Sequence, residues 1–495
     1  MSHLRHAAHR EGAHAEGTKA VTRLASLAVS LGLLGGCASV DPRPAFVDVQ
    51  KGIQARTGQR TEWARDTTGQ TPIQQAVKQF LQDELTVDRA VGVALLNNSS
   101  LQATFEEVGV SQAELAQASR IENPTFSGFT RFGGDPSGVN YELSLVQNVF
   151  DLLVQPLRKD VAAAALEQTK LRVANEVLSL AAEVKEAFFT LQARQQLVAR
   201  LRLVMDVMET AASFARKQHQ AGTIDDLALE NQLALHRQSK VEVALAEAEV
   251  RSDRERLNRL LGLWGADTAW RMASELPALP EQETPQEGLE SLAVARRQDL
   301  QAARWGVDLV GRALALKRNT RFFPVGLDFG INTEKEIGGG RVTGPELSLQ
   351  LPIFDTGKAS IARLEAEHRR AQRQLEALAV HARSEVRETR DRMLAARDRA
   401  TYYAQVLLPQ RVRILDLTIR RYNAMFKGAY DLLLAKQAHV EAERAHVEAQ
   451  RDYWISRARL ERALGGALPA DASSGAKGAT GAPPESSPVA AKEQP

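Results

Sequence analysis

The sequence predicts a mainly α-helical protein with a small amount of membrane-type β structure, built as two copies of one unit. In Val139–Phe150 and Val342–Phe354, apolar and polar residues alternate with a period of two, which is typical of a strand with one apolar and one polar face. Each stretch is followed by a long seven-residue repeat of apolar positions, the pattern of a coiled coil. Because both features recur in the same order, each copy is expected to contain a β-hairpin and a long helical hairpin.

The composition favours long helices over a large globular core. Aromatic residues make up only 5% of the 495 residues, and Ala, Leu, Arg, Glu and Gln dominate the long middle stretches. The formal net charge is +2, which gives no indication of a nucleic-acid partner.

Residues 1–36 are predicted to be a lipoprotein signal peptide. Basic residues precede the apolar run Leu24–Leu34, which is too short to cross a bilayer core of ~30 Å as a helix. The run ends in Leu34-Gly35-Gly36-Cys37, which resembles a bacterial lipobox and implies cleavage before Cys37 and acylation of its thiol, for example with palmitate. Ala38 after the cysteine, rather than Asp, implies sorting to the outer membrane. The alternative is an ordinary signal peptide with an incidental cysteine; either way, a single cysteine allows no intramolecular disulfide.

The first copy follows a polar N-terminal arm, residues 37–85, and covers residues 86–262. A helical pattern is expected up to Asn123-Pro124, since the residue before a proline avoids the helix. The copy is completed by two strands and a helical hairpin, at 125–132, 139–149 and 156–262. The first helix of this hairpin, which Gly222 ends, would be roughly 95 Å long at 1.5 Å per residue.

A proline-rich connector, residues 263–287, leads to the second copy, residues 288–466. Glu346-Leu347-Ser348-Leu349 repeats Glu142-Leu143-Ser144-Leu145. Two strands and a helical hairpin are expected again, at 325–332, 342–353 and 357–465.

The second helical hairpin has its own turn signals. We expect a bend at Pro409, and Gly428 with the acid that follows it is expected to mirror Gly222 and its acids. The tail, residues 467–495, is rich in Ala, Gly, Ser and Pro and is expected to be disordered.

No predicted element is available to cover the apolar faces of the four strands. Lipid could cover them, but a bilayer tolerates only a closed barrel, because unpaired backbone groups are costly in hydrocarbon. Four strands cannot close, whereas two chains would give eight strands and three would give twelve, enough for a pore. The alternative is a cover made of protein, which would give a soluble sandwich.

The order of these elements, the junctions Val149-Phe150-Asp151 and Pro352–Gly357, and the segment Gly428–Gln437 resemble the TolC-like outer-membrane efflux factors. With the lipobox, the chain looks like the lipoprotein branch that serves resistance–nodulation–division pumps. The resemblance covers residues 70–466. It implies a homotrimer with a twelve-stranded outer-membrane β-barrel continued by a twelve-helix periplasmic α-barrel. It also implies an exit duct that docks to a periplasmic adaptor and an inner-membrane pump, with no cofactor, no metal and no catalysis.

In such a duct the lining carries the function. Glu142, Asp328 and Glu346 lie at polar-face positions of the strands, which predicts a polar lumen that favours cations. The alternative is that a water-facing surface only needs solubility.

At the far end, the resemblance implies an iris-like gate at the tips of the helical hairpins. Asp431 falls at the acidic position of the family, and Asp225 or Asp226 is expected at the equivalent place in the first copy. Crowding of such acids in a ring would raise their pKa values. The alternative is helix capping, since acids stabilise the first turn of a helix. Leu434 stands where the family often has a second acid.

Three residues before the second tip, Arg420, Arg421 and Tyr422, are candidates for a lock onto the acids of the first copy. The alternative is a solvated helix face.

Other classes of function find less support. The sequence contains no nucleophile motif, phosphate loop or paired acids of an active site, and the histidines of the predicted helices are scattered. A lipid-anchored coiled-coil spacer of the envelope would explain the helices and Cys37, but not the strands. No feature identifies the cargo, whose selection is assigned to the pump.

Overall fold

The computed structural model of the 495-residue chain describes residues 40–65, 67–133, 138–281, 283, 287–321, 326–350 and 353–468. The chain separates into two units, residues 1–42 and 43–495, and the helices and strands of the described residues lie in the second. The predicted signal peptide, Cys37 and the tail beyond residue 468 lie outside the described residues. Among the helices of the described residues, none combines the length and the apolar character needed to cross a bilayer.

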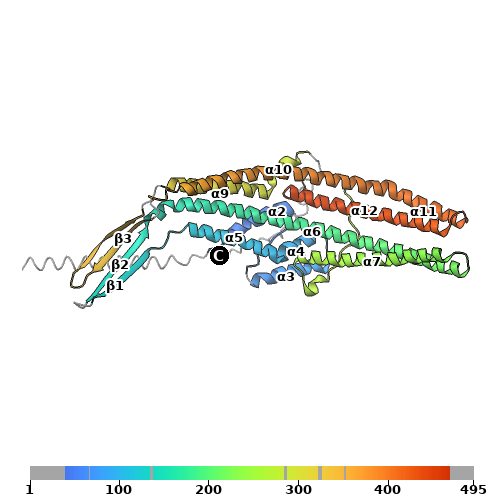
Figure 1. The fold of residues 1–495 in the computed structure, drawn as a ribbon, viewed down its shortest axis with the longest axis horizontal. Coiled ribbons are helices and arrows are strands. Elements are labelled where there is room, and N and C mark those ends of the chain that lie inside the picture. Colours follow the sequence, from blue (N-terminus) through green and yellow to red (C-terminus); the bar gives the residue numbers. More distant parts are fainter. Residues whose placement is uncertain are drawn as a thin grey trace, which may run out of the picture. The chain divides into compact units, whose positions relative to one another are not determined.

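The first half of this unit begins with four helices and continues through two strands into two long helices (Figure 1). They are α2 (Arg43–Thr57), α3 (Thr67–Gln82), α4 (Val87–Asn97), α5 (Ser99–Ala118), β1 (Thr125–Gly133), β2 (Gly138–Asn148), α6 (Val149–Gln220) and α7 (Asp226–Leu261).

The second half repeats the order of helices, two strands and a helical hairpin. Its elements are a short 3-10 helix (Gly265–Thr268), α8 (Leu289–Arg296), α9 (Gln298–Thr320), β3 (Leu327–Lys335), β4 (Arg341–Leu349), α10 (Lys358–Tyr402), a π-helical turn (Tyr403–Leu407), α11 (Leu408–Asn423) and α12 (Ala429–Ala463). The predicted fold class, mainly helical with a small antiparallel sheet, is confirmed. The π-helical turn ends at Leu407, two residues before Pro409, the position at which a bend is predicted.

The four strands form one antiparallel sheet in the order β1-β2-β3-β4. Its second hairpin is displaced from the predicted bounds of 325–332 and 342–353. The reason is that Glu334 and Lys335, which lie beyond the predicted strand, pair with Val342 and Arg341 and extend the hairpin at its turn. β4 then ends at Leu349.

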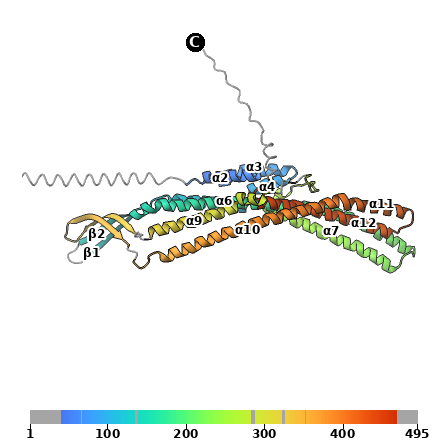
Figure 2. The same ribbon diagram turned by 90° about the horizontal axis from the view of Figure 1, so that it is seen from above.

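Helix α6 begins at Val149, not at Pro156 as predicted. The side chain of Asn148 caps it by accepting a hydrogen bond from the Asp151 N–H at 2.8 Å. Pro156 therefore lies inside the helix. With 72 residues, α6 is ~108 Å long at 1.5 Å per residue, and both views place the strands at one end and the α6–α7 turn at the other (Figure 1, Figure 2).

The return helix of each copy is anchored at its C-terminus by a break between two earlier helices. Between α4 and α5, the Asn97 side chain donates to the Gly262 carbonyl at 2.8 Å and the Asn98 side chain to the Leu260 carbonyl at 2.9 Å. Arg297 is the residue between α8 and α9, and its side chain donates to the carbonyl of Ala463, the last residue of α12, at 3.4 Å. The two copies thus use the same anchoring scheme with different side chains.

Gly262 provides a test of this anchor. We expect Gly262→Ala to lower the free energy of unfolding by more than the ~1–2 kcal/mol that a left-handed conformation costs a residue with a Cβ. The reason is that Gly262 has φ +68° and a Cβ there would meet the Asn97 carbonyl oxygen at 2.6 Å. Gly222→Ala is the control, because Gly222 has φ +70° with no neighbour within 4 Å. The measurement is the thermal unfolding of both variants; equal losses would show that contact with Asn97 is unimportant.

Candidate functional site

The sheet places the three predicted lumen residues on one face. Residues directly opposite one another on paired strands share a face. Glu142 is opposite Phe129 and Glu334, Glu346 is opposite Gly330, and Asp328 is opposite Asn148 and Ser348. Counting in steps of two along each strand puts all of these on the face of Ser144. That face is therefore rich in carboxylates.

Hydrogen bonds to side chains of other strands hold two of these carboxylates. The Asn332 side-chain amide donates to Glu142 Oε1 at 2.7 Å, and the Ser144 hydroxyl donates to Glu346 Oε2. Glu346 reaches Ser144 across Gly330, which has no side chain to intervene. The bonds hold the two acids against the polar face of the sheet.

Sequence reasoning missed two other charged residues of this face, Glu334 and Arg131. Glu334 is opposite Glu142, and Arg131 is opposite Asn140. Alternation would have placed Glu334 on this face if the predicted strand had been extended by two residues. Arg131 lies in a strand whose alternation is broken, because the apolar Phe129 is on the polar face. The polar face therefore carries one arginine among four carboxylates.

The opposite face of the sheet is largely apolar, with Lys335 and Arg341 at its turn end, and none of the described residues covers it. Phe132 of β1 is 80% exposed and Leu347 of β4 is 67% exposed. In the middle of the sheet, Leu145 is opposite both Phe126 and Ile331, and all three are exposed. An exposed apolar surface of this kind indicates contact with lipid or with another protein.

The turn between α6 and α7, here called tip 1, is closed by backbone hydrogen bonds. The Gly222 N–H donates to the His219 carbonyl and the Thr223 N–H to the Gln218 carbonyl, both at 2.9 Å, with Gly222 at φ +70°. This is the usual glycine-containing C-cap. Asp225 Oδ1 then caps α7 by accepting from the Ala228 N–H at 2.8 Å, and Asp226 Oδ1 lies 2.7 Å from His219 Nε2. Both acids of tip 1 therefore have local partners.

The turn between α11 and α12, here called tip 2, corrects the expected correspondence with tip 1. The same backbone pattern recurs, but Met425, at φ +61°, occupies the place of Gly222. Gly428 occupies the N-cap place of Asp225, so its predicted equivalence with Gly222 is wrong. Sequence reasoning failed here because a methionine is rarely found at positive φ.

Asp431 is therefore three residues after the N-cap, and its positional counterpart is Ala228 rather than Asp225 or Asp226. Its carboxylate accepts from the Gly428 N–H at 3.1 Å and lies 2.8 Å from the Lys427 ammonium. The hydrogen bond from Lys427, followed by that from Gly428, lowers the pKa of Asp431 below its ordinary value. Within one chain these contacts oppose the increase that crowding in a ring would cause.

The three predicted lock residues have roles within their own hairpin. The Arg420 guanidinium pairs with Asp416 of α11 at 2.8 Å. The backbone carbonyls of Arg421 and Tyr422 accept from the N–H groups of Phe426 and Met425, at 2.8 and 2.9 Å. The structure does not bring these three residues to Asp225 or Asp226, whose partners lie in tip 1. Sequence reasoning also missed that Met425 and Phe426, 94% and 82% exposed, give tip 2 an apolar end.

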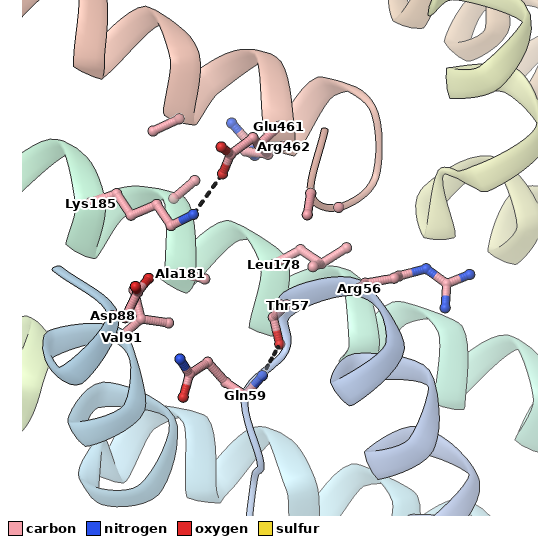
Figure 3. Close-up of a pocket in the computed structure, with 14 residues that line it drawn as sticks. Arg56, Thr57, Gln59, Asp88, Val91, Leu178, Ala181, Lys185, Glu461 and Arg462 are labelled. Carbon is pink, nitrogen blue, oxygen red and sulfur yellow. Dashed lines mark hydrogen bonds and ion pairs between the residues drawn. The ribbon is translucent and has the colours of Figure 1, made fainter. Parts of the chain in front are cut away.

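A cavity between α2, α4, α6 and the end of α12 is too small for a substrate. It has a volume of about 50 Å³, and Lys185 on its wall pairs with Glu461 at 2.6 Å (Figure 3). One water molecule needs ~10–15 Å³ of such volume, so the cavity has room for a few water molecules. In the part of the chain that the structure describes, no three His, Cys, Asp or Glu side chains come close enough to hold a metal ion.

Comparison with known proteins gives one family match and several structural ones. Residues 289–466 match the family model described as outer membrane efflux protein. Comparison with curated proteins finds no match. Among solved structures, a membrane protein from Pseudomonas aeruginosa is 23% identical, with a TM-score of 0.63 over 77% of this chain and 92% of that chain. The CmeC outer membrane channel of Campylobacter jejuni is 16% identical, with a TM-score of 0.65 over 85% and 92%.

A third structure, the MtrE outer membrane channel of Neisseria gonorrhoeae in its open state, is 20% identical, with a TM-score of 0.62 over 77% of this chain and 89% of that chain. At these identities the likeness establishes the fold. The chain therefore has the fold of these channels over most of its length.

Proposed function

We propose that this chain, whose residues 289–466 match the family model described as outer membrane efflux protein, is the outer-membrane exit duct of a tripartite efflux system. The observation that carries the proposal is the sheet, which has an apolar face exposed and carboxylates on the opposite face. In a closed ring the apolar face would contact lipid and the carboxylates would line a water-filled lumen.

Three copies of the chain form the duct. Among the described residues β1 pairs with β2 alone and β4 with β3 alone, so each has an edge available for another strand. An unpaired edge is untenable in hydrocarbon, and three chains would supply twelve strands, enough to leave a pore. The long helices α6, α7 and α10–α12 would continue the pore as a twelve-helix tunnel. A periplasmic adaptor and an inner-membrane pump, of the resistance–nodulation–division class, would hand over the cargo.

An acyl chain on Cys37 anchors the N-terminus in the same membrane. Support comes from α2, which runs parallel to α6. Its Asp48 lies 3.1 Å from Lys170, and Arg56 near its C-terminus lines a cavity with Lys185, fifteen residues farther along α6. The N-terminus of α2 therefore points toward the strand end of α6, as an anchor in the membrane requires.

The duct is tested by two measurements on the detergent-purified protein. We expect a trimer that resists dissociation in unheated gel samples, and ion conductance in planar bilayers with a preference for cations. A water-soluble monomer without conductance would overturn the proposal and favour the spacer lipoprotein.

The tips act as a gate whose closed state depends on their acids. For Asp431→Ala we expect a higher single-channel conductance, because loss of the carboxylate removes both the bond to Gly428 and the ion pair with Lys427. Asp416→Ala is the control, since it breaks an ion pair of comparable exposure in the preceding helix. Unchanged conductance and cation preference in Asp431→Ala would remove Asp431 from the gate.

A further inference from the structure

Within one chain, β2 of the first copy pairs with β3 of the second, and this pairing is a template for the contact between chains. The segment Glu142–Leu145 of β2 recurs as Glu346–Leu349 of β4. The hairpins then relate β1 to β3, because Arg131 is opposite Asn140 in the first and Asn332 is opposite Gly344 in the second. Asn140 and Gly344 are separated by the same offset as the repeated segments. Arg131 is therefore the positional counterpart of Asn332.

At the internal junction, β2 of the first copy pairs with β3 of the second. Ser144 lies opposite Asn332, and the Asn332 side chain reaches diagonally to Glu142 Oε1 at 2.7 Å. A ring of three chains needs the same kind of junction again, now between β4 of one chain and β1 of the next. The contacts of that second junction follow when Ser144 and Glu142 are replaced by their counterparts Ser348 and Glu346, and Asn332 by Arg131.

We propose that β4 pairs antiparallel with β1 of a second copy of this chain, with Ser348 opposite Arg131 of the partner subunit and Glu346 ion-paired with that arginine. The inference rests on the ring of the proposed function and adds its register. The Glu142–Asn332 hydrogen bond inside the chain becomes a Glu346–Arg131 ion pair between chains.

The charges of the polar face favour this pairing. Within the described residues Arg131 is exposed and pairs with no carboxylate of its own chain, whereas the other charged residues of the face are acids. Within one chain Glu346 leans across β3 and accepts from Ser144; the proposed ion pair therefore requires its side chain to turn to the open edge of β4. A long side chain can reach its diagonal neighbour on an adjacent strand.

The apolar face agrees with the same register. Leu143 is opposite Thr333 at the internal junction, so its counterpart Leu347 comes opposite Phe132 of the partner subunit. Leu347 and Phe132 are among the most exposed apolar residues of the sheet. Pairing them joins the two apolar faces into one continuous band around the ring.

Cysteine cross-linking tests the register directly. The only natural cysteine, Cys37, is acylated in the proposed lipoprotein, so two introduced cysteines would be the reactive pair. Under mild oxidation in isolated outer membranes, we expect Arg131→Cys/Ser348→Cys to give covalently linked dimers and trimers. Directly opposite residues have Cα atoms ~4.5–5.5 Å apart, within the ~4.4–6.8 Å that a disulfide spans.

Two matched pairs control the chemistry. Ser144→Cys/Asn332→Cys occupies the same geometry within one chain and should give an internal disulfide without linking chains. Ser127→Cys/Ser348→Cys lies four residues out of register, ~13 Å along the strand, and should give no link. Links through Ser127, or none through Arg131 while the internal control forms its disulfide, would overturn the register.

Charge reversal tests the ion pair separately. We expect Arg131→Glu to reduce the heat-resistant trimer at least threefold, and the double variant Arg131→Glu/Glu346→Arg to restore it. A double variant as defective as the single one would overturn the ion pair. If reduced, unheated samples of the unmodified protein contain trimer, failure of either test concerns the register alone; if they contain only monomer, the duct and the register both fail.

Discussion

An arginine in place of Leu143 is expected to abolish assembly in the membrane. Leu143 lies in the middle of β2 on the apolar face, where it packs over Gly128. An arginine at the bilayer midplane of a barrel costs about 2–4 kcal/mol, and a trimer would incur that cost three times. We therefore expect Leu143→Arg to shift the protein from heat-resistant trimer in the outer-membrane fraction to aggregated or degraded chains.

The matched control is Ser127→Arg, which introduces the same side chain in β1 on the polar face, opposite Ser144. In a water-filled lumen this arginine remains solvated, so we expect trimer at nearly the unmodified level and a weaker preference for cations. The measurement is the amount of unheated trimer in sedimented membranes. Equal amounts from the two variants would contradict the assignment of the faces.

Loss of Arg297 is expected to be the most destabilising single change in the helical part. Arg297 is buried between α8 and α9 and binds Asp299 at 2.7 Å and Glu385 at 2.5 Å. Removing one partner of a buried ionic cluster costs about 3–5 kcal/mol, because the remaining charges stay buried without compensation. Since both carboxylates are about one-fifth exposed, we expect the loss of stability in Arg297→Ala to lie near the lower end of this range.

The control is Arg387→Ala, which breaks the exposed pair with Glu290 between α10 and α8. Exposed pairs contribute ~0–1 kcal/mol, so its unfolding should be close to that of the unmodified protein. Chemical unfolding followed by circular dichroism measures both variants. A similar loss of stability in Arg297→Ala and Arg387→Ala would show that the buried Arg297 cluster contributes no more than an exposed ion pair.

The same cluster predicts a pH dependence. Burial alone would raise the pKa of Asp299, but the hydrogen bond and charge of Arg297 and the Leu300 N–H outweigh burial and leave the pKa below its ordinary value. A carboxylate with a lowered pKa stabilises the folded state above its unfolded pKa, and this contribution disappears as the pH falls through the folded value. Below about pH 4 we therefore expect the unmodified protein to lose stability more steeply than Arg297→Ala. Parallel losses would argue against the linkage.

Several features could be predicted from single residues because they depend on local chemistry. Alternation placed Glu142, Asp328 and Glu346 on one polar face, since side chains of a strand point to opposite sides in turn. Gly222 ended the first long helix because it is free to adopt positive φ. Other features were misassigned because a local signal was overridden. Asn148 caps α6 before Pro156, and Met425 adopts the conformation expected of a glycine.

By itself, the sequence determined the helical character, the small sheet, the two faces of that sheet and the doubling of the unit. These follow from periodicity, which each strand or helix expresses without its neighbours. Only the tertiary structure decided the strand register, which sets Arg131 in the place of Asn332, and the local partners of Asp225, Asp226, Asp431 and Arg420. Register and pairing depend on residues far apart in the chain or across a turn, and periodicity carries no information about which of them meet.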